Sequence, residues 1–193
     1  ILKNIDLKIN RGDKICISGK SGSGKSTLVD IITGIINHEN LKIFCDDKLI
    51  EDNLFFQKKN FSYIPQSPSI FQTTIRENIT LFEDNIETEK YERALKLSRL
   101  DFVNNLLDKD KTILSENGDN ISGGQLQRIF VARAIYTNKN ILIFDESTNE
   151  LDSKTENEII DDIIKLPQTI LLITNKEEIK KKFNKIFQVE NIQ

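Results

Sequence analysis

The stretch "KICISGKSGSGKSTLVDII", residues 14–32, decides the fold of this chain. Its first five residues predict a buried strand, and apolar residues from Leu28 to Ile35 repeat at helical spacing. Between the two, "GKSGSGKST" (19–27) matches the pattern G-x-x-x-x-G-K-[ST]. Glycines let the backbone close around an anion, and the helix N-terminus adds positive potential. Strand, loop and helix in this order therefore predict a phosphate cradle.

This loop predicts a site for a nucleoside triphosphate. Lys25 is expected to reach the β- and γ-phosphates, and the Ser26 hydroxyl to ligate Mg²⁺. The structural alternative is a glycine/serine loop before a helix, and the order of the elements argues against it. A cradle alone implies a nucleotide and not a reaction. The predicted nucleotide-binding residues are Gly19, Lys20, Ser21, Gly22, Ser23, Gly24, Lys25, Ser26 and Thr27, with Gln66 added below.

Away from this loop, short apolar runs alternate with helical patterns, which predicts an α/β protein with a largely parallel sheet. Residues 67–138 read as mostly helical, with helices over about 87–107 and from about Ser122 onward, and predict an inserted helical subdomain. Buried strands are predicted at 14–18, 61–65, 141–145, 169–174 and 185–189, and half-exposed antiparallel strands at 2–9 and 41–47.

The composition fits a folded domain and excludes several classes. The chain has 193 residues, 38% of them hydrophobic, and a net charge of −3, which gives no electrostatic reason to expect a nucleic-acid partner. Cys16 and Cys45 lack metal-ligand spacing and are expected to be reduced. No run approaches the roughly 20 apolar residues of a membrane span, so the isolated domain is expected to be soluble.

An acidic pair follows the predicted strand "ILIFD" in "ILIFDES" (141–147). Ligands of open α/β sheets bind at the carboxyl ends of the strands. Asp145 suits a role in supporting Mg²⁺, a cation that prefers oxygen ligands. Glu146 is placed to orient and deprotonate a water that attacks the γ-phosphate. In isolation the pair would be read as solvated acids after a strand.

A second glycine motif, "ISGGQLQR" (121–128), opens another predicted helix. Ser122 is expected to cap this helix, and Gly123 and Gly124 to leave its first N–H groups accessible. Alone, the motif would be read as an ordinary glycine-containing cap. Because one chain does not need two anion sites for one nucleotide, a dimer in which this helix end faces the partner's γ-phosphate is the economical interpretation.

The order "GKSGSGKST", "YIPQ", "ISGGQLQRIFVARAI", "ILIFDES", "NELD" resembles the ATP-binding-cassette (ABC) ATPases across essentially the whole chain. The resemblance implies an α/β P-loop NTPase core (1–66 and 139–193) with a mostly parallel sheet, an antiparallel β subdomain and an inserted α-helical subdomain (about 67–138). It also implies ATP and Mg²⁺ as ligands, with Ser26, Gln66 and Asp145 at the metal.

The same resemblance implies a head-to-tail dimer, of this chain with itself or with a related cassette, that encloses two ATP molecules. Ser122, Gly123, Gly124 and Gln125 would complete the partner's site, and Asp152 would lie at the interface. "SPSIFQTTIRENITLF" after Gln66 resembles exporter-type cassettes, which continue from a membrane-spanning domain. We therefore expect an excised domain that works at the cytoplasmic face of a membrane. No residue matches the family's adenine-stacking aromatic, so weakened adenine binding is expected.

One position departs from the family pattern. In the family, the strand that corresponds to "ILLIT" of this chain ends in a histidine that contacts the γ-phosphate. This chain has Asn175 at that position. Asparagine donates a hydrogen bond but carries no charge, and His38, in a polar connection, is not expected to substitute. With Lys25 and Glu146, Asn175 completes the predicted catalytic set, and slower hydrolysis is expected. The alternative is that Glu146 alone suffices.

Three functions are compatible with these motifs. The first is an ATPase that drives export through dimer closure, with a lipid-linked saccharide or lipid as the favoured cargo and a peptide or drug as the alternative. The second is a module that dimerises with ATP but hydrolyses it poorly. The third is a soluble ABC ATPase that acts outside transport. Such an enzyme in DNA repair would need a long coiled-coil tract, and one in translation would normally have two cassettes in one chain. The sequence shows neither feature, which argues against this function.

Overall fold

The computed structural model describes residues 5–36, 41–50, 59–116 and 118–189, and His38 lies outside them. Contacts divide the chain into two compact units. The predicted division at about residues 67 and 138 stays a prediction, since the contacts also group 146–167 with the helical segment. The first unit comprises Ile1–Tyr63, Lys139–Asp145 and Gln168–Gln193, and the second comprises Ile64–Asn138 and Glu146–Pro167.

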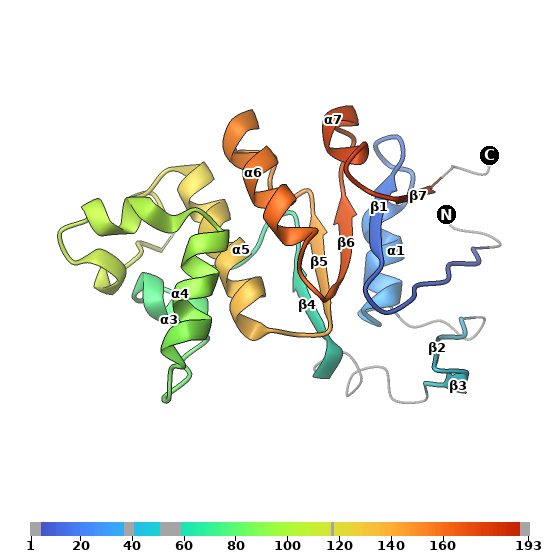
Figure 1. The fold of residues 1–193 in the computed structure, drawn as a ribbon, viewed down its shortest axis with the longest axis horizontal. Helices are drawn as coiled ribbons and strands as arrows, with labels where there is room; N and C mark the ends of the chain where they lie inside the picture. Colours follow the sequence, from blue (N-terminus) through green and yellow to red (C-terminus); the bar gives the residue numbers. More distant parts are fainter. Residues whose placement is uncertain (1–4, 37–40, 51–58, 117, 190–193) are drawn as a thin grey trace. The chain divides into compact units, whose positions relative to one another are not determined.

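A five-stranded sheet runs in the order β4–β5–β6–β1–β7 (Figure 1). β6 pairs in parallel with both β1 and β5, and β1 pairs in parallel with β7. All of β6 is buried, as expected for a strand with both faces covered. The predicted α/β class with a parallel sheet is confirmed. The strands are β1 (Lys14–Ser18), β4 (Phe61–Ile64), β5 (Ile141–Asp145), β6 (Thr169–Ile173) and β7 (Lys185–Gln188).

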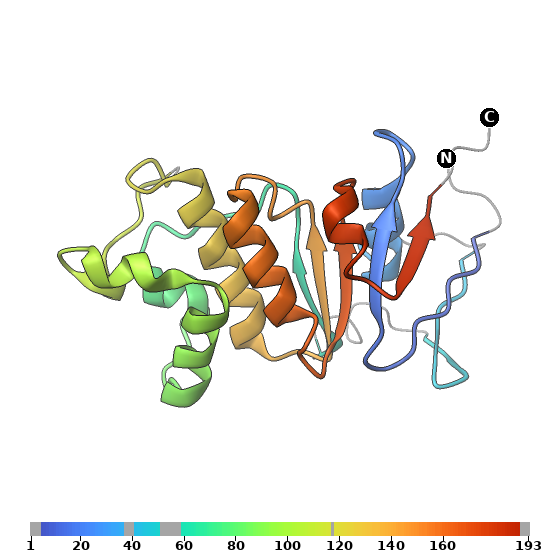
Figure 2. The same ribbon diagram turned by 45° about the horizontal axis from the view of Figure 1, so that its top comes forward.

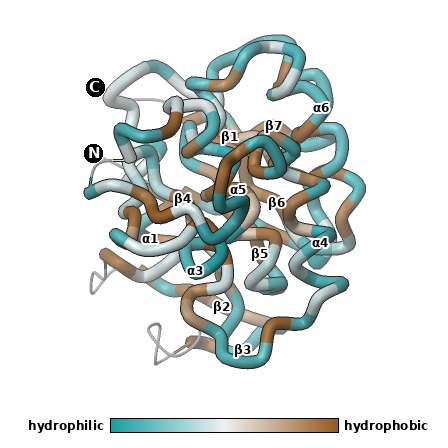
Figure 3. The backbone as a smooth tube through the Cα atoms, turned by 90° about the vertical axis from the view of Figure 1, so that its left-hand side faces the viewer, coloured by the Kyte–Doolittle hydropathy of each residue, from teal (hydrophilic) through white to brown (hydrophobic). Residues whose placement is uncertain are grey.

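Helix α1 (Lys25–Ile32) covers one face of this sheet and lies behind β1 in Figure 2. Its Leu28 and Val29 belong to a buried cluster that includes Ile15 and Ile17 of β1. The apolar residues of the strands are brown in Figure 3. This packing fixes the β1–α1 connection, because strand and helix are anchored in one core. The unit also contains α7 (Glu177–Lys180) and a small antiparallel sheet of β2 (Phe44–Cys45) and β3 (Lys48–Leu49).

Three sequence-based boundaries were wrong. Of the strand predicted at 2–9, residues 5–9 are described and form no strand. The strand predicted at 41–47 shrinks to β2, because Asp46 and Asp47 have positive φ angles of 49° and 63° that turn the chain into β3. Ile35 lies beyond α1, since Thr33 ends the helix and Gly34 follows with a φ of 64°.

The second unit is mainly helical, and α5 is its central helix. Seven residues of α5 are buried, and α3 and α4 pack against it. Of the segment predicted as helical over 87–107, the second half forms a 3₁₀-helix. The helices are α3 (Ile75–Thr80), α4 (Thr88–Leu97), the 3₁₀-helices η1 (Leu100–Asn105) and η2 (Lys109–Lys111), α5 (Gly123–Thr137) and α6 (Ser153–Ile163).

Candidate nucleotide-binding site

The loop between β1 and α1 is built to hold an anion. The N-cap of α1 is Gly24, with a φ of 96°, and no side chain caps the first N–H groups of the helix. The Lys25 ammonium turns back over the loop and donates to the carbonyl oxygens of Gly19 at 3.0 Å and Lys20 at 3.2 Å. An uncapped helix N-terminus beside a preplaced ammonium fits the phosphates of a nucleotide.

A buried hydroxyl supports this reading of the loop. Ser23 is 1% exposed, and among the described residues its hydroxyl finds no hydrogen-bond partner. A buried polar group without a partner costs about 1–3 kcal/mol, which a bound acceptor such as a phosphate oxygen recovers. Ser26 is exposed at the first turn of α1, where its hydroxyl is available to a cation. The loop residues therefore fit a triphosphate with its Mg²⁺.

The base of the loop is closed by elements that the sequence motif did not indicate. The Ser18 hydroxyl donates to Gln188 Oε1 at 2.6 Å, and the Val189 N–H donates to the Ser18 carbonyl oxygen at 2.8 Å. A Cβ at Gly19 would lie 2.4 Å from the Val189 carbonyl oxygen. Gly19 is therefore required by the close approach of the chain after β7, in addition to its part in the motif.

Asn175 lies at the end of β6 and contacts the same loop base. Its side-chain oxygen accepts a hydrogen bond from the Gly19 backbone N–H at 3.3 Å. The exposed amide thus holds the first residue of the loop in place. The sequence located Asn175 at the tip of this strand, but it did not indicate the contact with Gly19.

Asp145 ends β5 and is 2% exposed. The Tyr63 hydroxyl, from neighbouring β4, donates to its carboxylate at 3.3 Å. Burial, together with the negative charge of Asp145, raises the pKa of Tyr63 well above its ordinary value, so the phenol stays a donor. The sequence did not indicate that Tyr63 contacts Asp145, although Tyr63 belongs to "YIPQ", because a tyrosine in a strand is ordinarily a packing residue.

Glu146 begins a tight turn in the second unit. Its φ of 50° lies in the left-handed region, which is uncommon for a residue other than glycine. One carboxylate oxygen accepts from the Asn149 side-chain amide at 3.1 Å, and the Glu146 carbonyl accepts from the Asn149 N–H. The buried Thr148 hydroxyl donates to Glu156 of α6 at 2.7 Å. The turn thus holds the Glu146 carboxylate through one of its two oxygens.

The start of α5 has the predicted cap. Ser122 accepts from the Gln125 N–H at 3.2 Å, and Gln125 Oε1 accepts in return from the Ser122 N–H at 3.0 Å, which forms a capping box. Ser122 and Gly123 are exposed. A Cβ on Gly123 would meet the Glu150 carboxylate at 1.9 Å, so the glycine lets this acidic side chain lie over the helix start.

Two further predicted residues, Asp152 and Gln66, are exposed. Asp152 is the N-cap of α6 and accepts from the Thr155 N–H at 3.0 Å. Hydrogen bonding to Thr155 lowers the pKa of Asp152, so its carboxylate stays charged. Gln66 is exposed just after β4. The first unit contains residues 19–27 with Asp145 and Asn175, and the second contains Gln66, Ser122–Gln125, Glu146 and Asp152.

The described residues contain neither a cluster of metal-ligating side chains nor a helix that could span a membrane. Groups of three or more His, Cys, Asp or Glu side chains able to hold a metal do not occur in the described ranges. A Mg²⁺ ion on a serine hydroxyl, waters and phosphate oxygens does not need such a group. Across those same ranges, the helices are all too short or too polar to span a membrane.

Comparisons with known proteins agree on one family. The ABC transporter family model matches residues 2–149. The leukotoxin translocation ATP-binding protein LktB of Mannheimia glucosida is 36% identical over 195 residues, which covers 98% of this chain and 27% of LktB. The multidrug resistance protein pgp-1 of Caenorhabditis elegans is 36% identical over 158 residues, which covers 81% of this chain and 12% of that protein.

A solved structure gives the same result. The structure of a bacterial Atm1-family ABC exporter with ATP bound superposes with a TM-score of 0.87 at 27% identity and covers 93% of this chain and 32% of that one. The chain thus spans about a third or less of the proteins it resembles. With the phosphate loop, the acidic pair and the capped glycine motif in place, the matches establish that this chain is an ATP-binding cassette of the ABC transporter family.

Proposed function

We propose that the chain is the ATP-binding and ATP-hydrolysing module of an exporter. The observation that carries the proposal is the loop geometry, in which the Lys25 ammonium turns back over the loop, the buried Ser23 hydroxyl has no hydrogen-bond partner among the described residues, and the start of α1 has no side-chain cap. The names of LktB and of the Atm1-family exporter refer to translocation and export, which supports a transport role.

The proposed hydrolysis of ATP assigns one role to each group of site residues. Residues 19–27 bind the phosphates, and Lys25 balances charge on the β- and γ-phosphates. Glu146 takes a proton from a water whose oxygen bonds to the γ-phosphorus, while the bond from that phosphorus to the ADP oxygen breaks. Mg²⁺, held through Ser26, Gln66 and Asp145, would neutralise charge that develops on the phosphate oxygens.

We further propose that two cassettes close head to tail around two ATP molecules, with residues 122–125 and Asp152 of each completing the partner's site. The exposed N-terminus of α5 supports this, because the positive end of the helix dipole favours an anion, although the Glu150 carboxylate that lies over Gly123 would have to move aside for the phosphate. Closure would be relayed to a membrane-spanning domain, which we expect in the same polypeptide and which would place the chain at the cytoplasmic face of a membrane.

The cargo is proposed from sequence alone. "ENGDNISGGQ" favours a lipid-linked saccharide or lipid. The relatives' names point to competing classes, a leukotoxin for LktB and drugs for pgp-1. The membrane-spanning domain would select among them.

Phosphate release by the full-length protein at saturating ATP tests the hydrolytic role. We expect Glu146→Gln to lower turnover by about 100-fold or more, as loss of a general base does, and to retain ATP. The matched control is Glu92→Gln, which removes an exposed carboxylate on α4 and should leave turnover unchanged. If the wild type and Glu146→Gln are equally slow, the chain is instead a nucleotide-gated module with little hydrolysis, the second candidate, which Asn175 in place of histidine favours.

A further inference from the structure

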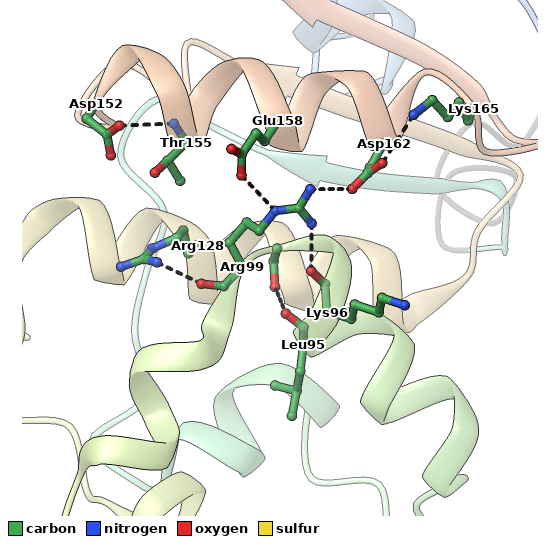
Figure 4. Close-up of polar contacts among 10 residues, drawn as sticks. Leu95, Lys96, Arg99, Arg128, Asp152, Thr155, Glu158, Asp162 and Lys165 are labelled. Carbon is green, nitrogen blue, oxygen red and sulfur yellow. Dashed lines mark hydrogen bonds and ion pairs between the residues drawn. The ribbon is translucent and has the colours of Figure 1, made fainter.

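Arg99 joins three helices of the second unit through both its side chain and its backbone (Figure 4). It follows the end of α4 with a φ of 55°, a left-handed conformation that turns the chain into η1. Its guanidinium donates to Glu158 at 3.2 Å and to Asp162 at 2.7 Å, which lie one turn apart on α6. A third donor bonds the Lys96 carbonyl at 3.0 Å. Each of the three guanidinium nitrogens therefore donates one hydrogen bond within this corner.

The carbonyl oxygen of Arg99 is held from α5. Arg128 donates to it at 2.7 Å, and the Arg128 guanidinium lies over the Phe102 ring at 4.7 Å. Arg128 is on the second turn of α5, near the capped start at Ser122. Arg99 is consequently the residue through which the first turns of α5 and the second half of α6 are tied to the same corner.

A second tie connects the two helices at their N-terminal ends. The Gln127 side chain of α5 accepts from the Glu150 N–H at 2.9 Å, just before α6 begins. Gly124 lies against the same segment, since a Cβ there would be 3.1 Å from the Glu150 carbonyl oxygen. Neighbouring residues Gln127 and Arg128 thus anchor α6 at two points, one at its start and one, through Arg99, along its length.

The geometry points to Arg99 as a positioning residue that fixes the N-terminus of α6 relative to the N-terminus of α5, so that Asp152 and residues 122–125 meet the partner's nucleotide as one surface. This inference rests on the proposed head-to-tail dimer. One fork that bonds two carboxylates and a carbonyl defines an orientation, which a single surface ion pair does not. The Arg99 side chain is 27% and that of Asp162 24% exposed, so solvent screens this contact only in part.

The test measures closure of the ATP site in the full-length protein that carries Glu146→Gln. The readout is labelled ATP that stays bound after dilution into excess unlabelled ATP. We expect Arg99→Ala to raise the ATP concentration for half-maximal retention about tenfold, which corresponds to about 1.4 kcal/mol. In an added Ser122→Arg background, which blocks closure, Arg99→Ala should leave ATP affinity unchanged because the phosphate loop is intact.

The matched control is Arg76→Ala. Arg76 makes an equally close bond to Asp110, at 2.8 Å, and lies over the Tyr91 ring in the same unit, but neither partner belongs to α5 or α6. The Arg76→Ala variant should therefore leave ATP retention unchanged.

The failures can be told apart. If Glu146→Gln by itself retains no ATP, the proposed dimer is wrong and the inference falls with it. If Glu146→Gln retains ATP and Arg99→Ala retains it equally well, the dimer stands and the positioning role is wrong. The same conclusion follows if Arg76→Ala weakens retention as much as Arg99→Ala, because the effect is then one of stability.

Discussion

The side-chain oxygen of Asn175 lies 3.3 Å from the backbone nitrogen of Gly19 and accepts its hydrogen bond, so the tip of β6 holds the first residue of the phosphate loop. The Lys25 ammonium binds the carbonyl oxygen of that same Gly19 at 3.0 Å. Both polar groups of Gly19 are therefore engaged, the N–H by Asn175 after a neighbouring strand and the carbonyl by Lys25. Asn175 thus acts on the loop itself, whatever it contacts when nucleotide is bound.

Replacing Asn175 with alanine removes the Gly19 contact. A typical intramolecular hydrogen bond contributes about 1 kcal/mol, so ATP affinity should fall about fivefold. Equilibrium ATP binding to the Glu146→Gln protein measures this without turnover. The control is Asn184→Ala, an exposed asparagine between α7 and β7 outside the loop contacts described above. Equal affinity of Asn175→Ala and the parent would show that the contact does not shape the loop.

Replacing Asn175 with histidine tests the expected slow hydrolysis. An imidazole reaches farther than an asparagine amide and can carry charge, and hydrogen bonds to charged groups contribute about 1.5–3 kcal/mol. Turnover of the full-length protein should rise about tenfold or more. Its pH profile should gain an inflection near the ordinary histidine pKa of about 6.5, which Asn175 cannot produce. Unchanged turnover would mean that Glu146 alone suffices.

Gly19 and Gly22 provide a matched pair for the phosphate loop. A Cβ at Gly19 would lie 2.4 Å from the Val189 carbonyl oxygen, whereas a Cβ at Gly22 would meet nothing within 4 Å. Overpacking costs about 1–3 kcal/mol, and a Cβ this close to a backbone atom belongs at the upper end of that range, so Gly19→Ala should destabilise the protein by about 3 kcal/mol and weaken ATP binding. Gly22→Ala should cost about 1 kcal/mol, because its φ of 75° is unfavourable for alanine. Urea unfolding measures the free energy of unfolding of both variants. Equal losses of stability in Gly19→Ala and Gly22→Ala would contradict the contact between Gly19 and Val189.

The Arg99–Asp162 ion pair predicts a pH-dependent contribution to stability. Burial by itself would raise the pKa of Asp162, but hydrogen bonds and charges from Arg99 and Lys165 outweigh it and lower the pKa below the ordinary value. A carboxylate with a lowered folded-state pKa stabilises the fold above its unfolded pKa, and this stability is lost as pH falls through the folded value.

Arg99→Ala should therefore destabilise the protein at pH 7, and the difference from wild type should shrink below about pH 3.9, the ordinary aspartate pKa. Urea unfolding at a series of pH values measures it. Asp162→Asn serves as the control, since it removes the titrating group while keeping most of the side-chain shape. A difference between wild type and Arg99→Ala that stays constant into acid would contradict the assigned charge interaction.

The sequence by itself determined the elements whose signals are local. The glycine-rich loop fixed β1 and α1, because backbone closure around an anion demands those residues at that spacing. The apolar runs at 141–145 and 169–174 predicted β5 and β6, because strands covered on both faces are largely apolar. Ser122 capped α5 as predicted, since a cap and its third helical residue are neighbours in sequence.

Local signals failed where tertiary contacts decide the outcome. Residues 5–9 alternate like a strand but form none, because alternation does not supply a pairing partner. The bond from Gly19 to Asn175 joins residues 156 positions apart, and that from Arg99 to Asp162 joins residues 63 apart. Neither pair carries a pattern in the sequence, because an asparagine or arginine side chain accepts many surroundings and only the fold selects its partner. The motif located the phosphate site, and the tertiary structure decided which side chains hold it in place.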